Sequence, residues 1–399
     1  MAKTADAVVI GGGVIGASLA FYLSKAGLKV TLVEKKHLGY GGTGASTAII
    51  RMHYDNAPET RLAVASYPVW ANWADNVGAG DPDFEKRGVL WLVGEADAEK
   101  MQKNVTMHRA VGAKTQIVTP DVIERIEPAL DTTNVALAAW EPQSGWADPL
   151  AATSGFAEAA HDKGAEVELD TTVVDVILTA GRVVGVRTDR GFVDTPVVVN
   201  AAGPWAGRIA QMVHLDLPIN VERRQIAVFD QPPDVARQSV AVVDQVTGIY
   251  FRPDSAGAIQ VGMNKRGDEV NPDEYNRAPD PDFADTVKRL LSARLSAMDR
   301  GEFRAGWSGL VDMTPDGKAI LGAAGPHGFY LACGFSGTGF NFAPAVGLCL
   351  TELIVGGQAK TVDIEPFRLS RFAEGQPIRG EWEYEGGGGF EQRREAREL

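Results

Sequence analysis

The stretch Ala7-Val8-Val9-Ile10-Gly11-Gly12-Gly13-Val14-Ile15-Gly16 decides the fold of this 399-residue chain. Its first four residues are apolar and mostly β-branched, which predicts a short buried strand of a parallel sheet. The glycines predict a tight turn, and the apolar pattern over 14–25 predicts a helix that ends at Gly27. A second strand is expected over 29–34, so the chain opens with a β-α-β unit.

The spacing Gly11-x-Gly13-x-x-Gly16 between strand and helix predicts a dinucleotide-binding turn. Gly11 permits the tight turn, Gly13 lets a pyrophosphate approach the backbone, and Gly16 lets the helix pack closely on the sheet. The phosphates would accept hydrogen bonds from N–H groups at the positive end of the helix. Glu34, which ends the second strand, can accept hydrogen bonds from ribose hydroxyls, and its charge disfavours a 2′-phosphate. The alternative is a glycine-rich turn in a domain that binds no nucleotide.

The composition excludes several classes of protein. The formal net charge of −13 would repel the phosphate backbone of a nucleic acid. Cys333 and Cys349 are too few for a disulfide framework, so we expect a cytoplasmic protein. The six histidines lack the paired spacing of metal ligands, and no metal is expected. The 18 uncharged residues 7–24 approach the length of a membrane span, but their glycines favour a buried strand, turn and helix rather than a span or signal peptide.

Nucleotide-type β-turn-α patterns occur at both ends of the chain, with a β-rich block between them. Residues 218–263 alternate as strands do, and helices are expected over 58–77, 281–298 and 343–355. The sequence therefore predicts an α/β fold with two interleaved domains. The expected ranges are 1–78, 140–215 and 305–365 for a cofactor domain, 79–139 and 216–304 for a substrate domain, and 366–399 for a partly mobile C-terminal extension.

Four motifs resemble the D-amino-acid oxidase-like flavoenzymes, in the branch of the sarcosine and glycine oxidases. They are the dinucleotide motif, the loop 39–46 leading to Ile49-Ile50-Arg51, the strand 197–205 ending Asn200-Ala201-Ala202-Gly203-Pro204-Trp205, and Met313-Thr314-Pro315-Asp316-Gly317 followed by the turn 334–340. A nicotinamide enzyme would continue with more βα units instead of entering the loop 39–46. The resemblance implies a two-domain α/β flavoprotein, with an N-terminal Rossmann-type FAD-binding domain and an interleaved mixed-sheet substrate domain.

The same resemblance implies a set of FAD-binding residues. A helix N-terminus at the turn 334–340 would stabilise negative charge on the reduced flavin, and two adjacent valines would line the adenine, although packing alone would also explain them. The expected FAD ligands are Gly11, Gly13, Val14, Ile15, Gly16, Glu34, Lys35, Gly42, Thr43, Ala45, Ser46, Thr47, Val173, Val174, Ala202, Gly203, Trp205, Gly334, Ser336, Gly337, Thr338, Gly339, Phe340 and Asn341.

Five side chains are candidates for contact with the substrate. Arg51 stands where the family keeps a carboxylate-binding arginine, and the forked guanidinium suits an amino-acid carboxylate; a structural salt bridge is the alternative. Tyr250 and Arg252 lie two residues apart on a strand, so they share a face that is predicted to lie over the flavin. His53 and Trp307 are further candidates, for which a role in the core or between domains is the alternative.

The chain also departs from the family. Gly309 replaces the cysteine that attaches FAD in monomeric sarcosine oxidases, and Pro149 replaces a histidine used by other relatives, so non-covalent FAD is expected. Asn341 replaces a second cation for the substrate carboxylate. The oxygen-activating lysine falls on Glu269, with Lys265 nearby. The electron acceptor, either oxygen or an electron-transfer partner, therefore stays open.

The function implied is FAD-dependent oxidation of a small amino acid, foremost a secondary amine such as an N-substituted glycine of the sarcosine or iminodiacetate type. A hydride would leave the carbon beside nitrogen for flavin N5, and the imine would then be hydrolysed. Two alternatives remain: an FAD-dependent 2-hydroxy-acid dehydrogenase, and the flavin subunit of a multi-subunit amine dehydrogenase. The oligomeric state stays open.

Overall fold

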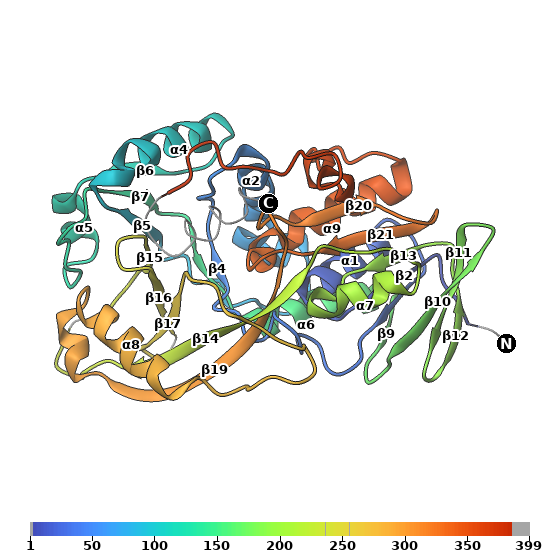
Figure 1. Cartoon of the computed structure of the whole chain (residues 1–399), viewed down its shortest axis with the longest axis horizontal. Helices are drawn as coiled ribbons and strands as arrows, with labels where there is room; N and C mark the ends of the chain where they lie inside the picture. Colours follow the sequence, from blue (N-terminus) through green and yellow to red (C-terminus); the bar gives the residue numbers. More distant parts are fainter. Residues whose placement is uncertain (1–2, 236, 255, 385–399) are drawn as a thin grey trace.

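The computed structural model of the protein describes residues 3–235, 237–254 and 256–384. Two large β-sheets dominate the molecule and lie next to each other along its long axis (Figure 1). The glycines 386–389, on which the predicted mobility of the C-terminal extension rests, lie outside the described residues.

A six-stranded sheet forms around the N-terminal strand β2 (Ala7–Ile10). All four residues of β2 are buried, as their apolar character predicts, and parallel strands pair with both of its edges. The strands come from three separate stretches of the chain, so this region is discontinuous in sequence. Their order is β20 (Ile320–Ala323), β21 (Phe329–Cys333), β13 (Val198–Asn200), β2, β3 (Val30–Val33) and β9 (Glu166–Glu168), with β20 antiparallel to β21.

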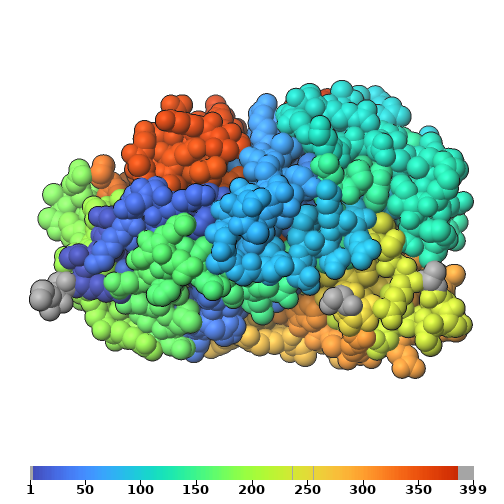
Figure 2. Space-filling model, turned by 180° about the vertical axis from the view of Figure 1, so that it is seen from behind, coloured from blue at the N-terminus to red at the C-terminus, as the bar shows by residue number. Residues whose placement is uncertain are grey.

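Three apolar helices pack together against this sheet: α1 (Val14–Lys25), α6 (Pro149–Asp162) and α9 (Gly339–Gly356). Phe21 of α1 meets Phe156 of α6 with ring centroids 5.8 Å apart. Figure 2 shows the N-terminal residues in blue beside green residues from the middle of the chain. By length and composition α9 could cross a membrane, but 61% of it is buried inside the protein, where contact with α1 explains its apolar character.

A smaller sheet and the short helix α7 (Ala206–Gln211) contribute apolar side chains to a second core beside β2. Three strands of this sheet come from the segment that follows β9, and the fourth is the first strand of the chain. Its order is β1 (Lys3–Thr4), β12 (Gly191–Asp194), β11 (Arg182–Thr188) and β10 (Val173–Thr179).

The large sheet is mixed, because β5 and β15 run parallel while the other pairs are antiparallel. Helix α8 (Pro281–Ser292) buries Val287 and Leu291 in its core, and α4 (Ala98–Ala110) and α5 (Pro120–Ile126) pack beside β7. The order is β18 (Asp268–Glu269), β14 (Asn220–Asp230), β17 (Ala258–Met263), β16 (Ile249–Pro253), β15 (Ala241–Asp244), β5 (Val89–Val93), β7 (Leu137–Glu141) and β6 (Gln116–Val118), with β19 (Glu302–Met313) paired to β14.

Several elements differ from the sequence-based expectation. The helix expected over 58–77 is two helices, α2 (Ala57–Ala71) and α3 (Trp73–Asn76). Asn72 leaves the helical region, with φ −136° and ψ 57°, and its side-chain amide donates to the Pro68 carbonyl at 3.3 Å. Strands β7 and β19 extend across the domain boundaries expected near residues 140 and 305.

Candidate active site

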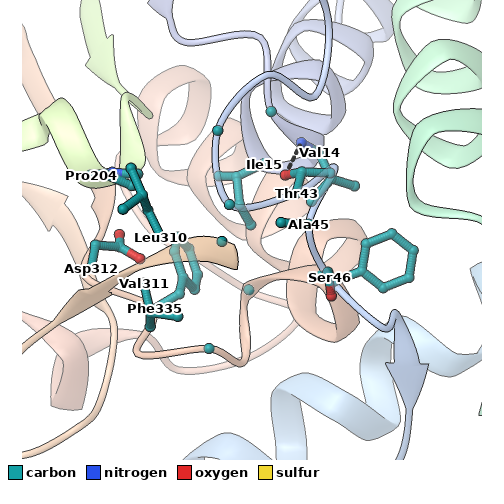
Figure 3. Close-up of a pocket in the computed structure, with 18 of the residues that line it drawn as sticks. Val14, Ile15, Thr43, Ala45, Ser46, Pro204, Leu310, Val311, Asp312 and Phe335 are labelled. Atoms are coloured by element: carbon teal, nitrogen blue, oxygen red, sulfur yellow. Dashed lines mark hydrogen bonds between the residues drawn. The ribbon is translucent and has the colours of Figure 1, made fainter. Parts of the chain in front are cut away.

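A cavity of about 790 Å³ lies between the two sheets and takes its lining from both. The first sheet contributes the turn after β2 and the start of α1, and the large sheet contributes side chains of β14, β16, β17 and β19. Figure 3 shows the middle of this cavity, where Val14 and Thr43 face Leu310 and Phe335 across it.

The N-terminus of α1 opens toward the cavity. Gly11 has φ +112°, and a Cβ there would lie 2.5 Å from the Ala201 carbonyl oxygen. A Cβ at Gly16 would clash with the Gly11 carbonyl, so Gly16 packs under the turn and does not line the cavity. Gly13 caps the helix without a side-chain hydrogen bond, and the Val14 N–H donates to Thr43 Oγ1 at 3.2 Å. The remaining N–H groups of the first turn have no partner within the helix and can donate to a ligand.

Glu34 directly follows strand β3 and places a buried carboxylate at one end of the cavity. Its two oxygens accept from the backbone N–H groups of Gly12 and Lys36, at 2.7 and 2.8 Å. A carboxylate has about four lone-pair sites, so acceptor capacity remains for ribose hydroxyls. Val173 lines the cavity beside it, but Val174 is 48% exposed and does not, because neighbouring residues of a strand point to opposite faces. The prediction for Val174 is therefore wrong.

A polar bridge from the large-sheet region crosses the same end of the cavity. Asp273 pairs with Lys35 at 2.9 Å and with Arg208, and it accepts from Trp205 Nε1 at 2.8 Å. The Lys35 ammonium lies 3.7 Å from the Trp205 ring centroid. Hydrogen bonds from these cationic and indole groups hold the pKa of Asp273 below its usual range, against the effect of desolvation. Sequence reasoning found Lys35 and Trp205 but missed Asp273 and Arg208.

The glycine-rich turn before α9 lies at the other end. Gly337 and Thr338 line the cavity with Gly339, Phe340 and Asn341, and the helix N-terminus has no side-chain cap. Gly334 does not line it, and its N–H donates to the buried Asp312 carboxylate at 2.6 Å. Burial raises the pKa of Asp312 to about 6.

Arg51 reaches this end from the short strand β4 (Ile49–Ile50), which pairs with β8 (Gly145–Trp146). Its guanidinium lies between two aromatic rings, 4.1 Å from the centroid of Tyr54 and 4.8 Å from that of Trp91. It donates to the His53 carbonyl, and among the described residues no carboxylate forms an ion pair with it. The predicted alternative of a structural salt bridge therefore finds no ion-pair partner in the described part of the chain, although the charge of Arg51 lowers the pKa of the buried Glu141 carboxylate against the larger effect of burial.

Asn341 positions Arg51 from the opposite side. Its amide donates to the Arg51 carbonyl at 2.6 Å and to the Tyr54 hydroxyl at 2.9 Å. In the resembled enzymes a second cation stands at this position. Here the neutral amide of Asn341 instead supports the backbone of Arg51. Tyr54 and Trp91 were missed because nothing in their local sequence distinguishes them from core aromatics.

Tyr250 lines the cavity from β16, but three other candidates for substrate contact do not. Arg252 Nε donates to the Thr47 carbonyl at 2.6 Å, and Trp307 Nε1 donates to the Ala45 carbonyl at 3.0 Å. Both side chains hold the loop 43–47 from outside the cavity. His53 is fully buried behind Trp91, against which its ring stacks at 4.6 Å. The predicted substrate contacts of Arg252, Trp307 and His53 are therefore corrected to supporting positions.

The structure also shows where the positions lie at which the chain departs from the resembled enzymes. A Cβ at Gly309 would overlap Ala45, so no larger side chain fits there, and Pro149 begins α6 and does not line the cavity. Glu269 is exposed on the edge strand β18, and neither it nor Lys265 lines the cavity. On the neighbouring strand β14, Arg224 lines the cavity and forms an ion pair with Glu222 at 2.7 Å.

The sequence profile of the family described as "FAD dependent oxidoreductase" matches residues 6–353, which is most of the chain. The chain belongs to this family of FAD-dependent oxidoreductases.

Two curated relatives and one solved structure illustrate the similarity. This FAD-dependent oxidoreductase is 28% identical to FAD-dependent oxidoreductase domain-containing protein 1 of Mus musculus, over 94% of this chain and 86% of that protein. It is 27% identical to sarcosine oxidase subunit beta of Rhodobacter capsulatus, over 94% of this chain and 90% of that protein. The crystal structure of L-proline dehydrogenase from P. horikoshii matches with a TM-score of 0.87 and 30% identity, over 95% of this chain and all of that one.

The cavity residues of this FAD-dependent oxidoreductase fit its cofactor. The missing side chain at Gly13 leaves the start of α1 open for a pyrophosphate, and Glu34 retains acceptors for ribose hydroxyls. With the adenosine near Glu34, the flavin would lie toward the turn 337–341, Arg51 and Tyr250. The uncapped N-terminus of α9 would there stabilise negative charge on a reduced flavin.

Proposed function

We propose that this FAD-dependent oxidoreductase oxidises a small amino acid, foremost a secondary amine of the N-substituted glycine type. The observation that carries the proposal is the Arg51 guanidinium, which lines the cavity without a carboxylate partner among the described residues. A fork of donors held between two rings suits a substrate carboxylate. Sarcosine and proline, named in the descriptions of two similar proteins, are both secondary amines with a carboxylate.

The remaining side chains at this end suit a neutral amine with an apolar substituent. Trp91, Val243, Met263 and Ile226 form an apolar wall, and Tyr250 adds a hydroxyl. The acidic side chains that line the cavity are Glu34 and Asp273 at the adenosine end and Asp312, which is bound to the Gly334 N–H. No acidic side chain of the described lining therefore stands beside Arg51 to stabilise an ammonium.

The chain contributes mainly binding and orientation. Arg51 would hold the carboxylate, Tyr250 would orient the amino group, and the apolar wall would exclude water. When bound, FAD supplies the acceptor for the two electrons. The substrate loses a hydride from the carbon beside nitrogen, and water then hydrolyses the imine to an amine and an oxo acid or aldehyde.

Anaerobic mixing with a panel of substrates tests the proposal. Sarcosine, iminodiacetate and proline should bleach the visible absorbance of the bound flavin, whereas lactate should leave it unchanged. Bleaching by lactate alone would instead assign a 2-hydroxy-acid dehydrogenase. If neither class bleaches the flavin, the proposal is wrong.

A second candidate, the flavin subunit of a larger amine dehydrogenase, is favoured by the similarity to sarcosine oxidase subunit beta over 90% of that protein. The purified single chain with its flavin distinguishes the two. Rapid, complete bleaching by an amine, followed by repeated turnover with oxygen, would contradict a need for partner subunits.

A further inference from the structure

The last described residues of the chain pack behind the substrate end of the cavity. In Figure 1 this segment, in red, passes from the region of β20 to α4. It is held by three backbone contacts: Ile378 N donates to Asp316 at 3.0 Å, Glu381 N to the Asp55 carbonyl at 3.0 Å, and Asn104 of α4 donates to the Trp382 carbonyl at 2.9 Å. The segment ends in Tyr384, which is only 9% exposed.

Tyr384 contacts the cavity wall through His53. Its hydroxyl shares a hydrogen bond of 2.6 Å with His53 Nε2, and the two rings stack with centroids 5.7 Å apart. This is the only hydrogen bond of the His53 ring among the described residues, because Nδ1 has no partner there. Tyr384 therefore adds a directional hydrogen bond to the ring contacts that the imidazole makes with Trp91 and His108.

His53 in turn contacts Arg51 and one of the two rings that flank it, Trp91. Its ring stacks on Trp91 at 4.6 Å, and its carbonyl accepts from the Arg51 guanidinium. Burial, helped by His108 and Arg51, lowers the pKa of His53. The ring stays neutral and adds no second positive charge beside Arg51.

We infer that Tyr384 is a positioning residue of the active site, which holds Arg51 and Trp91 through His53 in the geometry that binds a carboxylate. The inference rests on the proposed role of Arg51. It makes the C-terminal segment part of the substrate site, although Tyr384 lies far from Arg51 in sequence and does not line the cavity. Tyr384 would act on substrate affinity and leave the FAD site unchanged.

The test uses the full chain with bound FAD and two small probes of similar shape. Propionate carries a negative charge, and propionamide is its uncharged analogue. Binding is followed by the change in the visible flavin spectrum. We expect Y384A to weaken propionate about tenfold or more and Y384F, which keeps the ring but loses the hydrogen bond, about threefold. FAD content and propionamide binding should stay as in the wild type.

Tyr67→Phe is the matched control, because it also removes a buried hydroxyl, one that has no hydrogen-bond partner among the described residues. It should leave propionate affinity unchanged. If Y384F and Y384A both bind propionate as the wild type does, while R51A does not bind it, the inference is overturned and the proposed function stands. If R51A binds propionate normally, the role of Arg51 is wrong and both proposals fall.

Discussion

At the scale of single residues, the proposed substrate end of the cavity contains a cation that aromatic rings hold in place. Tyr54 and Trp91 flank the Arg51 guanidinium, and Asn341 fixes its backbone. Stacking leaves the outer N–H groups of the fork free, whereas an internal salt bridge would occupy them. The chain thus keeps a positive charge at the cavity, where the carboxylate of the proposed substrate would bind.

Replacing Arg51 should mainly affect catalysis. Losing one partner of a buried charge pair costs about 2–5 kcal/mol, so Arg51→Ala should lower kcat/KM by roughly 30-fold to several thousandfold. Arg51→Lys should recover only part of this, because an ammonium lacks the fork. Steady-state kinetics on the bleaching substrate measure the effect, with the exposed Arg61→Ala as control. Wild-type kinetics in Arg51→Ala would place carboxylate binding elsewhere.

His108 should make stability depend on pH. Burial lowers its pKa to about 4, and its Nε2 lies 2.6 Å from the Tyr54 carbonyl oxygen. In the unfolded chain an ordinary histidine takes a proton near pH 6.5, so the unfolded state binds more protons between about 6.5 and 4. The free energy of unfolding is therefore undiminished above this window and should fall by roughly 3 kcal/mol as the pH decreases through it.

Urea unfolding at pH 7 and pH 4.5 measures this change in wild type and in His108→Gln. The variant should lose part of the pH dependence, while the exposed His161→Gln should keep it. An identical pH dependence in wild type and His108→Gln would show that other groups cause it.

At the scale of elements, the loop 271–277 between β18 and α8 joins the large-sheet region to the adenosine end. Besides the Asp273 bridge, Arg277 donates to the Tyr40 hydroxyl at 2.7 Å, and Tyr40 also lines the cavity. A cofactor bound in the cavity would therefore lie between elements of both sheets. A bound cofactor could leave at this end only if the contacts of Asp273 and Arg277 break; otherwise it would have to leave at another side of the cavity.

Weakening this bridge should speed the loss of FAD. The Asp273 pairs are partly exposed, and such pairs contribute about 0.2–1 kcal/mol each, so Asp273→Asn should raise the FAD dissociation rate roughly two- to tenfold at low salt. The difference from wild type should shrink at high salt, because exposed charges are screened. Recovery of flavin fluorescence after dilution measures the rate. Asp234→Asn, which removes the exposed pair with Arg300, is the control; equal rates in Asp273→Asn and wild type at low salt would contradict the role of the bridge.

At the scale of the whole molecule, two sheets enclose a cavity that neither forms alone, and the chain passes between them several times. The close contact of Gly309 with Ala45 shows how tightly the β19 backbone meets the loop 43–47. Neither Cys333 nor Cys349 lines the cavity, and both are buried.

We therefore expect FAD to be held without a covalent bond. Acid precipitation of the holoprotein should release the flavin into the supernatant, where its absorbance at visible wavelengths can be measured. Proteolysis of the pellet supplies the control for trapped cofactor. Flavin that stays attached to a peptide after proteolysis would contradict the prediction.

Local sequence determined the cofactor half of the site. The turn Gly11–Gly16, the acid at Glu34 and the glycine-rich turn before α9 follow from backbone sterics and short-range periodicity, which neighbouring residues set. Prolines at 120, 149 and 281 each begin a helix, as their fixed φ predicts. These features were predicted because they need no information about distant residues.

Tertiary structure alone decided the part of the cavity that is proposed to bind the substrate. Tyr250 and Arg252 have the same local pattern, yet one lines the cavity and the other turns to the Thr47 carbonyl. Trp91 and Asp273 line the cavity from distant elements, and Tyr384 contacts His53 behind it, without any local motif. A side chain's direction at such positions depends on the partners that packing brings to it. Those partners are known only once strands separated by hundreds of residues lie side by side.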